Sequence, residues 1–267
     1  MTLTVLDRDQ SPAVGFSLWP VSMLPIVFSP ASGGPSAAVV WLHGFGDGAE
    51  SWAAELKDTR MARPTWTWVH LRARSLPQSF VQGRSFPAWG DFLDPGIVRV
   101  GSKDHEGGDA NGWYQDSVSM VHDAVRKLES EVDPSRIAVV GFSQGAALAA
   151  QAVFSYPRRL AGLAMLSGWM LPSARLALHA APFREDFNVF VSHGDEDDQV
   201  AFDAANFTLG HMREAKVNLT FVRVDKKTHY PAAQAALPKL VAFLDEHLNE
   251  PPSPEPVSKR LRSSDAP

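Results

Sequence analysis

The segment Val139–Ala150 reads VVGFSQGAALAA and places a Ser-Gln pair between two glycines, where an apolar run gives way to small residues. Gly141 to Gly145 fit the G-x-S-x-G pattern of a nucleophile elbow, which is a sharp turn from a strand into a helix. Such a turn is crowded, so its flanking positions must be small, and Gly141 and Gly145 satisfy that requirement. We predict that Ser143 is an exposed nucleophile; the alternative is a tight turn whose serine only caps the helix.

Apolar runs and amphipathic stretches alternate on both sides of this segment. Helical spacing of apolar residues predicts helices over 114–132 and 236–248. The segment 15–30 predicts one or two antiparallel edge strands. Short apolar runs predict buried strands over 37–43, 66–71, 136–142, 160–167, 187–194 and 218–224. This alternation is typical of an α/β fold, with a mainly parallel sheet covered by helices on both faces.

The length of 267 residues and the hydrophobic content of 45% suit a large α/β domain. We predict a single domain over residues 1–250, followed by a tail over 251–267 that is rich in proline, serine and charge and is expected to be disordered. Residues 87–112 form a long glycine-rich stretch with little periodicity. A stretch of this kind is usually a functional loop or a disordered one, and we place it near the site.

Composition excludes several classes of function. The chain has no cysteine, which rules out disulfides, thiolate metal sites and a cysteine nucleophile. A net charge of −5 with both signs spread along the chain indicates no nucleic-acid partner. The N-terminal sequence lacks the apolar core of a signal peptide, and no apolar run approaches the ~18 residues of a membrane span. We expect a cytoplasmic protein, with KRLR at 259–262 as a weak basic motif for nuclear access.

A nucleophile elbow predicts an acid and then a histidine, each after a later strand. The run VFVSHGDEDDQV, 189–200, ends in an acidic loop with the four carboxylates Asp195, Glu196, Asp197 and Asp198, and their spacing does not choose among them. The run FVRVDKKTHYP, 221–231, ends in a loop that carries His229. His229 follows the acid and precedes the last helix, so we predict that it is the general base for Ser143.

The other histidines have more ordinary interpretations. His43 and His193 each precede a glycine at a strand end and are expected to brace loops, while His70 lies in a strand and His105 in the irregular stretch. Those that fall in helical patterns are expected at the surface: His122, His211 and His247.

The run WLHGFGDGAESW, 41–52, is a strand that ends in a glycine-rich turn. A loop at this position supplies one backbone N–H of an oxyanion hole, and the residue after the nucleophile supplies the other. We therefore predict that Phe45 and Gln144 donate these N–H groups. The alternative, a phosphate-binding loop, lacks the required lysine or serine and the G-x-G-x-x-G pattern.

Four motifs, LHGFGDGAESW, GFSQGAALA, LSGWMLP and HGDEDDQV, occur in this order over about residues 36–248. Together they resemble the acyl-protein thioesterase and small carboxylesterase family of α/β hydrolases, which includes lysophospholipase-like members. The resemblance implies an α/β-hydrolase fold without a large cap domain. It also implies that the acid is Asp197, the fifth position of H-G-x-x-D-x-x-V, with His229, Phe45 and Gln144 in the roles given above.

The same resemblance suggests two tryptophans as substrate-binding residues. PAWGDF, 87–92, is similar to a family segment near the acyl channel, which makes Trp89 a candidate substrate-binding residue. Trp169, directly after LSG, is a second candidate, although either tryptophan could equally belong to the core. The chain departs from the family pattern at Asp198, where many members have proline, at the KKT before the histidine, and in the polar stretch between Trp89 and Trp113.

The resemblance implies a serine hydrolase that transfers an acyl group to water and needs no cofactor or metal. Expected substrates are S-acylated proteins, with lysophospholipids or simple esters next, reached through transient contact with a membrane surface by a monomer or weak homodimer. One alternative is a carboxylesterase for small soluble esters. A receptor on a hydrolase scaffold would usually lack a member of the triad, and a peptidase would usually carry a gating domain for which the chain has no room.

Overall fold

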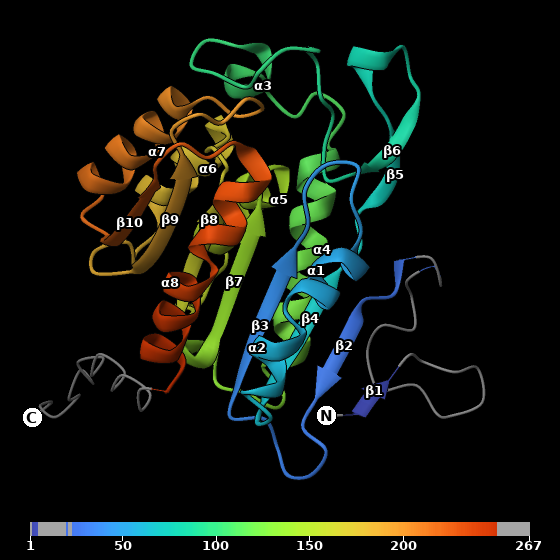
Figure 1. Cartoon of the computed structure of the whole chain (residues 1–267), viewed down its shortest axis with the longest axis vertical. Helices are drawn as coiled ribbons and strands as arrows, with labels where there is room; N and C mark the ends of the chain where they lie inside the picture. Colours follow the sequence, from blue (N-terminus) through green and yellow to red (C-terminus); the bar gives the residue numbers. More distant parts are fainter. Residues whose placement is uncertain (1, 5–19, 21–22, 250–267) are drawn as a thin grey trace, which may run out of the picture.

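The computed structural model describes residues 2–4, 20 and 23–249, and its central element is an eight-stranded sheet. The strand order is β1-β2-β4-β3-β7-β8-β9-β10 (Figure 1). The strands are β1 (Thr2–Thr4), β2 (Ile26–Ser29), β3 (Ala37–Leu42), β4 (Trp66–Leu71), β7 (Ile137–Phe142), β8 (Gly162–Leu166), β9 (Asn188–Gly194) and β10 (Asn218–Val224). The strands from β4 to β10 in this order are parallel, whereas β2 pairs antiparallel with β4, and β1 with β2.

Both faces of the sheet are buried, and β3 shows why its sequence is apolar throughout. All six residues of this strand are buried. Ala38, Val40 and Leu42 belong to one core cluster, while Ala37, Val39 and Trp41 belong to another. Because successive side chains of a strand point to opposite faces, a strand covered on both sides needs apolar residues at every position.

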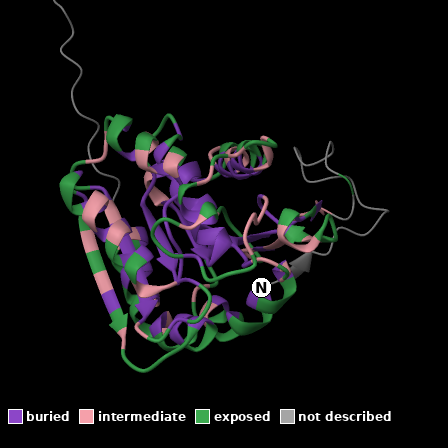
Figure 2. Cartoon of the chain, turned by 90° about the horizontal axis from the view of Figure 1, so that it is seen from above, coloured by how far each residue is buried: buried purple, intermediate pink, exposed green. Residues whose placement is uncertain are grey.

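Helices cover each face of the sheet. The cluster with Val40 also contains residues of α4 (Trp113–Leu128), α5 (Gln144–Phe154), α6 (Pro172–Ala180) and α7 (Phe202–Glu214). The cluster with Trp41 contains residues of α1 (Ala49–Glu55) and α8 (His229–Asn249), and the short α2 (Lys57–Met61) follows α1. In Figure 1, α1 and α8 lie in front of the sheet and α4 and α5 behind it. Figure 2 shows the buried residues concentrated at the centre, with exposed ones on the outer helices and loops.

The α/β fold and its six parallel strands confirm the sequence prediction, and β2 confirms an antiparallel edge strand. The last helix begins at His229, earlier than the predicted residue 236. The loop predicted to carry His229 therefore ends before this residue, which opens the helix. Pro231 fits in the first turn, where the amide that proline lacks has no acceptor within a helix. Most of the predicted edge region before residue 23 and the tail over 251–267 lie outside the described residues.

The stretch 87–112 begins at the end of β6 (Ser85–Ala88), which pairs with β5 (Arg74–Pro77) as a separate antiparallel ribbon. The stretch contains the short α3 (Lys103–Glu106) and is otherwise irregular. The buried side chain of Asp104 accepts hydrogen bonds from the amides of Leu93 (2.7 Å) and Asp94 (3.2 Å) and so fixes the backbone. Burial raises the pKa of Asp104. The neighbouring His105 is fully buried against Phe207, so the stretch is packed on the domain here.

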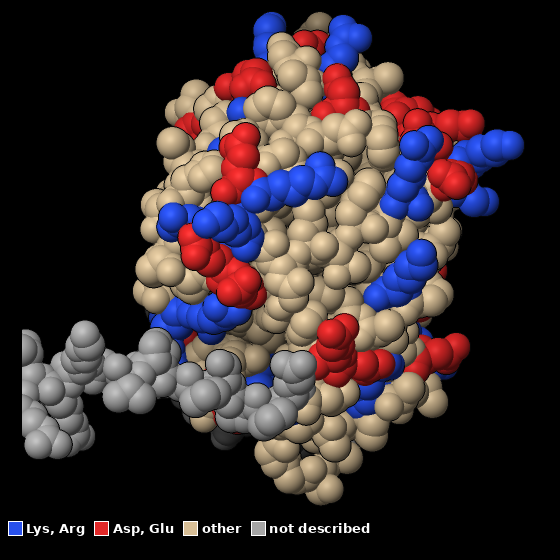
Figure 3. Space-filling view, turned by 90° about the vertical axis from the view of Figure 1, so that its left-hand side faces the viewer, with Lys and Arg blue, Asp and Glu red and all other residues tan. Residues whose placement is uncertain are grey.

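The surface carries charges of both signs. Figure 3 shows the side that is on the left in Figure 1, where Lys and Arg alternate with Asp and Glu around a broad uncharged area. None of the helices in the described part of the chain has the length and apolarity that a membrane span requires.

Candidate active site

Ser143 lies between the end of β7 and the start of α5, with φ 55° and ψ −122°. This backbone conformation is strained for a residue with a side chain. A Cβ atom on Gly145 would lie 2.5 Å from the carbonyl oxygens of both Leu42 and His43, so only glycine lets the turn pack on the end of β3. The side chain of Ser143 makes no capping hydrogen bond to α5, which excludes the helix-cap alternative.

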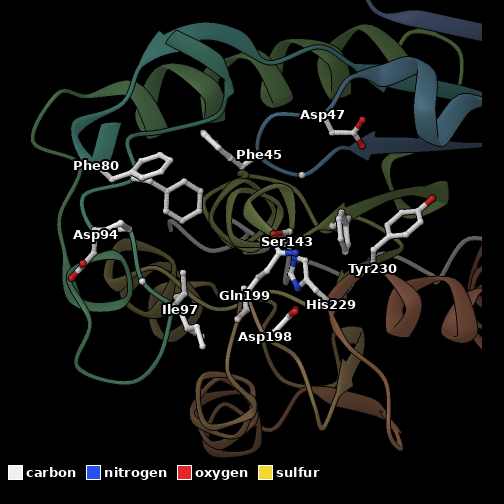
Figure 4. A pocket seen from close by; sticks show the side chains of 17 residues that line it. Phe45, Asp47, Phe80, Asp94, Ile97, Ser143, Asp198, Gln199, His229 and Tyr230 are labelled. Atoms are coloured by element: carbon white, nitrogen blue, oxygen red, sulfur yellow. Dashed lines mark hydrogen bonds between the residues drawn. The ribbon is translucent and has the colours of Figure 1, made fainter. Parts of the chain in front are cut away.

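The structure brings Ser143, His229 and Asp197 into one chain of contacts. Ser143 Oγ lies 2.8 Å from His229 Nε2. His229 Nδ1 lies 2.8 Å from Oδ2 and 3.0 Å from Oδ1 of Asp197. The three residues follow β7, β10 and β9, whose carboxyl ends meet at one edge of the sheet. Figure 4 shows Ser143 and His229 side by side at the centre of a cavity.

Four groups bind the carboxylate of Asp197, namely two main-chain amides and the imidazoles of His193 and His229. Its Oδ1 accepts the amides of Val200 (2.8 Å) and Gln199 (3.0 Å). Burial opposes ionisation of this carboxyl group, but hydrogen bonds from His193 and His229 outweigh it and hold the pKa of Asp197 well below its usual range. The carboxylate is therefore ionised at neutral pH and can orient the N–H at Nδ1 of His229.

The other three carboxylates of the acidic loop serve elsewhere. Asp195 pairs with Arg223 at 2.8 Å and accepts the amide of Lys226 at 2.6 Å. Asp198 lines the cavity and Glu196 is exposed. Sequence spacing could not show which of the four carboxylates contacts His229, because all four lie within a single turn. The choice depends on the directions of their side chains.

The backbone of the glycine-rich turn after β3 lies against the nucleophile. A Cβ atom on Gly44 would lie 3.4 Å from Cβ of Ser143, and Phe45 lines the cavity together with Ser143. Gln144 is the first residue of α5, and the first amides of a helix have no acceptor within it. The main-chain N–H groups of Phe45 and Gln144 are thus the candidate donors for an oxyanion.

Trp89 does not line the cavity, which corrects the expectation for this residue. It is fully buried, and its indole N–H donates to the carbonyl oxygen of His43 at 2.7 Å. Its main-chain N–H donates to Oε1 of Gln144 at 2.9 Å, and its carbonyl accepts the hydroxyl of Ser117 at 2.7 Å. A buried indole needs an acceptor, and Trp89 finds one in the turn that carries Phe45.

Trp169 is the second correction. It too is fully buried and does not line the cavity; its indole N–H donates to the carbonyl of Asp104 at 3.1 Å. Its ring packs against Phe92, which does reach the cavity, with 6.0 Å between the centroids. Both tryptophans thus support the residues that form the cavity wall, and a sequence motif does not distinguish a wall residue from the one behind it.

The cavity beside Ser143 has a volume of about 440 Å³, within the usual range for a small-molecule site. Phe45, Phe80 and Ile97 lie on one side of it and Tyr230 on the opposite side (Figure 4). Phe92 also lines the cavity and packs on Phe45, so this side forms an aromatic and aliphatic wall. Sequence analysis missed Phe80, Phe92, Ile97 and Tyr230. Membership in the irregular stretch was a signal for Phe92 and Ile97, whereas Phe80 carried none.

The family model described as Phospholipase/Carboxylesterase matches residues 25–250. The chain is 28% identical over 232 residues to Acyl-protein thioesterase 1 of Mycosarcoma maydis, covering 83% of this chain and 95% of the relative. It is 27% identical over 187 residues to Carboxylesterase SOBER1 of Arabidopsis thaliana, covering 68% and 78%. The crystal structure of Arabidopsis thaliana SOBER1 superposes with a TM-score of 0.69 at 24% identity, over 79% of this chain and 99% of that one.

Proposed function

The chain belongs to the phospholipase/carboxylesterase family and is a serine hydrolase of ester or thioester bonds, and we propose that its substrates are S-acylated proteins. The observation that carries the proposal is the 2.8 Å contact between Ser143 Oγ and His229 Nε2 beside an apolar cavity wall. A nucleophile beside an apolar wall suits a substrate with an acyl chain, because the chain would lie along Phe45, Phe80 and Phe92.

We propose the following mechanism. Ser143 Oγ attacks the thioester carbonyl carbon while its proton passes to Nε2 of His229. The tetrahedral oxyanion accepts hydrogen bonds from the amides of Phe45 and Gln144, each worth ~3–4 kcal/mol of transition-state stabilisation. As the C–S bond breaks, His229 returns the proton to the departing cysteine sulfur. Water then attacks the acyl-serine by the same route in reverse, which releases the fatty acid and restores Ser143.

Asp197 supports each proton transfer. Its carboxylate stabilises the imidazolium that forms at His229 and keeps the N–H on Nδ1, so that Nε2 faces Ser143. Since the pKa of Asp197 is held well below its usual range, the carboxylate stays ionised at neutral pH. No cofactor is part of this mechanism.

The substrate class is supported by two observations. The fungal relative that covers most of this chain is named an acyl-protein thioesterase. Phe45 packs on Phe80 (5.8 Å between centroids) and on Phe92 (5.0 Å), and this aromatic cluster offers an apolar surface for the methylenes of an acyl chain. Lysophospholipids present the same acyl chain on an oxygen ester, and access to either substrate would involve transient contact with a membrane surface.

A carboxylesterase for small soluble esters is the second candidate, favoured by the plant relative named a carboxylesterase. The test is a series of S-acyl cysteine peptides from acetyl to palmitoyl, with matched p-nitrophenyl esters. We expect kcat/KM to increase with chain length and to favour the thioester. A preference for acetyl over palmitoyl in both series would replace the thioesterase assignment with the small-ester assignment.

A further inference from the structure

A second group of chemically reactive side chains lies outside the cavity, on the surfaces of α6 and α7. His179 is in the last turn of α6, and His211 and Glu214 are in the last turn of α7. One ligand atom from each of the three lies within 4.8 Å of the other two, and no other group of this kind occurs among residues 2–4, 20 and 23–249. None of the three residues lines the cavity that contains Ser143.

The separation of the two imidazole nitrogens in this group matches the spacing of ligands around a tetrahedral metal ion. Nε2 of His179 lies 3.3 Å from Nδ1 of His211, and Nδ1 of His211 lies 3.9 Å from Oε2 of Glu214. Two nitrogen ligands at 2.0–2.1 Å from Zn²⁺ in a tetrahedron are themselves about 3.3 Å apart. The two imidazoles therefore already have the separation that one shared ion would impose.

Packing holds His211 in this arrangement. The ring of His211 lies edge-on to Phe207, one turn earlier in α7, with 4.9 Å between the centroids. The guanidinium of Arg175 covers Phe207 at 4.7 Å and binds Glu106 at 3.1 Å, so its positive charge beside the site is compensated. Glu214 follows His211 by three residues and shares its helix face, and its exposed side chain is free to turn toward the ion.

We propose that His179, His211 and Glu214 bind one Zn²⁺ ion, with water completing the tetrahedron, and that the ion links α6 to α7. Two imidazoles and one carboxylate are a ligand set that zinc accepts, and three protein ligands leave one position open. The outer ring nitrogens, Nδ1 of His179 and Nε2 of His211, carry the protons when the inner ones bind metal. This site is independent of the serine chemistry and of the proposed substrate.

The site also connects to the wall of the cavity. Arg175, one turn before His179, donates to the main-chain carbonyl of His105 at 2.7 Å. His105 follows Asp104, whose carboxylate holds the amides of Leu93 and Asp94 at the cavity wall. Zinc at the ends of α6 and α7 would thus stabilise the elements on which the irregular stretch 87–112 is packed.

The test is calorimetric titration of ZnCl₂ into the full-length chain after removal of metals with a chelator. We expect one ion per chain for the wild type. His179→Gln and Glu214→Gln should each weaken binding by at least about tenfold, since even the loss of a group that only supports a metal ligand costs ~10–100-fold. The control is His247→Gln, a half-buried histidine of α8 that packs against Phe243 and lies outside the group, and this variant should bind as the wild type does.

A thermal unfolding series gives a second readout. Zinc at roughly 100 times its dissociation constant should raise Tm of the wild type and of the His247→Gln variant by about 5 °C. At the same zinc concentration, a site weakened tenfold or more should give the His179→Gln variant no more than about half of that shift. The proposal is overturned if the wild type binds no more tightly than the His179→Gln and Glu214→Gln variants, or if the His247→Gln variant loses binding equally. Both substituted positions are at the surface, so each variant should fold, and its Tm without zinc verifies this.

Discussion

His193 binds the same carboxylate oxygen of Asp197 as His229 does. Nε2 of His193 lies 3.2 Å from Oδ2 of Asp197 and 2.8 Å from the carbonyl oxygen of Val200. Both neighbours are acceptors, so Nε2 carries a proton and donates it. His193 is fully buried in β9, and it ties Asp197 and Val200, both in the loop that follows, to this strand. We interpret His193 as a positioning residue for Asp197, which gives the loop-bracing role expected from the sequence a specific partner.

We expect His193→Leu to lower kcat by roughly 10–100-fold, because a small displacement of a catalytic group costs up to ~10²-fold. His193→Gln, whose amide can reach the same oxygen, should recover most of the loss. KM should change little in either variant. If His193 had only a structural role, any difference in kcat between the two variants would follow their difference in stability. Both kcat and Tm should therefore be measured for each variant. Equal kcat values for the two variants would contradict the positioning role.

Ser143→Ala should reduce kcat by about 10⁵–10⁶-fold with the fold retained, since the nucleophile acts with His229 as a unit. A fluorophosphonate probe should label the wild type at Ser143 and leave the variant unlabelled. Failure of the wild type to react would support the receptor alternative.

Ser143→Gly should be more stable than Ser143→Ala by about 1 kcal/mol, although both lack activity. The reason is the backbone conformation of φ 55° and ψ −122°, which glycine adopts without strain and alanine does not. Chemical denaturation of the two variants measures the difference. An alanine variant as stable as the glycine variant would mean that the turn relaxes when the serine is removed.

The ionisation of Asp197 should make part of the stability depend on pH. Its pKa in the folded protein lies below the value near 3.9 of an unfolded chain, so the protein is stabilised above that value and loses the contribution as the pH falls. The wild type should therefore exceed Asp197→Asn in unfolding free energy at pH 7, and the difference should shrink at pH 3. Urea unfolding of both proteins at the two pH values measures it. A difference that grows toward pH 3 would mean that the carboxyl group is favoured in its protonated form.

Gly145→Ala should destabilise the protein by several kcal/mol or prevent folding. Its new Cβ would lie 2.5 Å from two carbonyl oxygens at the end of β3, where no flexible side chain can move aside. The matched control is Gly210→Ala in α7, where nothing lies within 4 Å of the added Cβ. Alanine is a better helix former, so this control should gain about 0.5–1 kcal/mol. Thermal unfolding compares the two, and a small effect at position 145 would show that the turn has room to shift.

Trp89 supports the turn that carries Phe45, whereas Phe92 lines the cavity, so substitutions of the two should change the kinetic constants differently. Trp89→Phe removes the hydrogen bond to the carbonyl of His43, so kcat should decrease by a similar factor for every acyl length. Phe92→Ala removes a residue of the wall, so kcat/KM should decrease more for long acyl chains than for acetyl. The thioester series described above measures both. If the loss of kcat/KM depended on acyl length only in the Trp89→Phe variant, Trp89 would be a residue of the cavity wall after all.

The candidate site was predictable from the sequence to different degrees. The order of an elbow, an acidic loop and a late histidine indicated Ser143 and His229, because each of these features is local to one strand end. The choice of Asp197 needed the family resemblance, since four neighbouring carboxylates share the same local pattern. For His193 the local pattern indicated only a loop-bracing role, and for Tyr230 the only signal was its place beside His229. Phe80 had no local signal, because its role depends on contacts between segments far apart in the chain.

By itself, the sequence determined the alternation of buried strands and helices and the position of the sharp turn at Ser143. Hydrophobic periodicity and the size of a glycine act over a few residues, so they can be read without coordinates. Tertiary structure alone decided that His193 shares Asp197 with His229, that Trp89 and Trp169 lie behind the cavity wall, and that His179 meets His211. These outcomes depend on the direction of side chains from elements brought together by the sheet, and no short stretch of sequence contains that information.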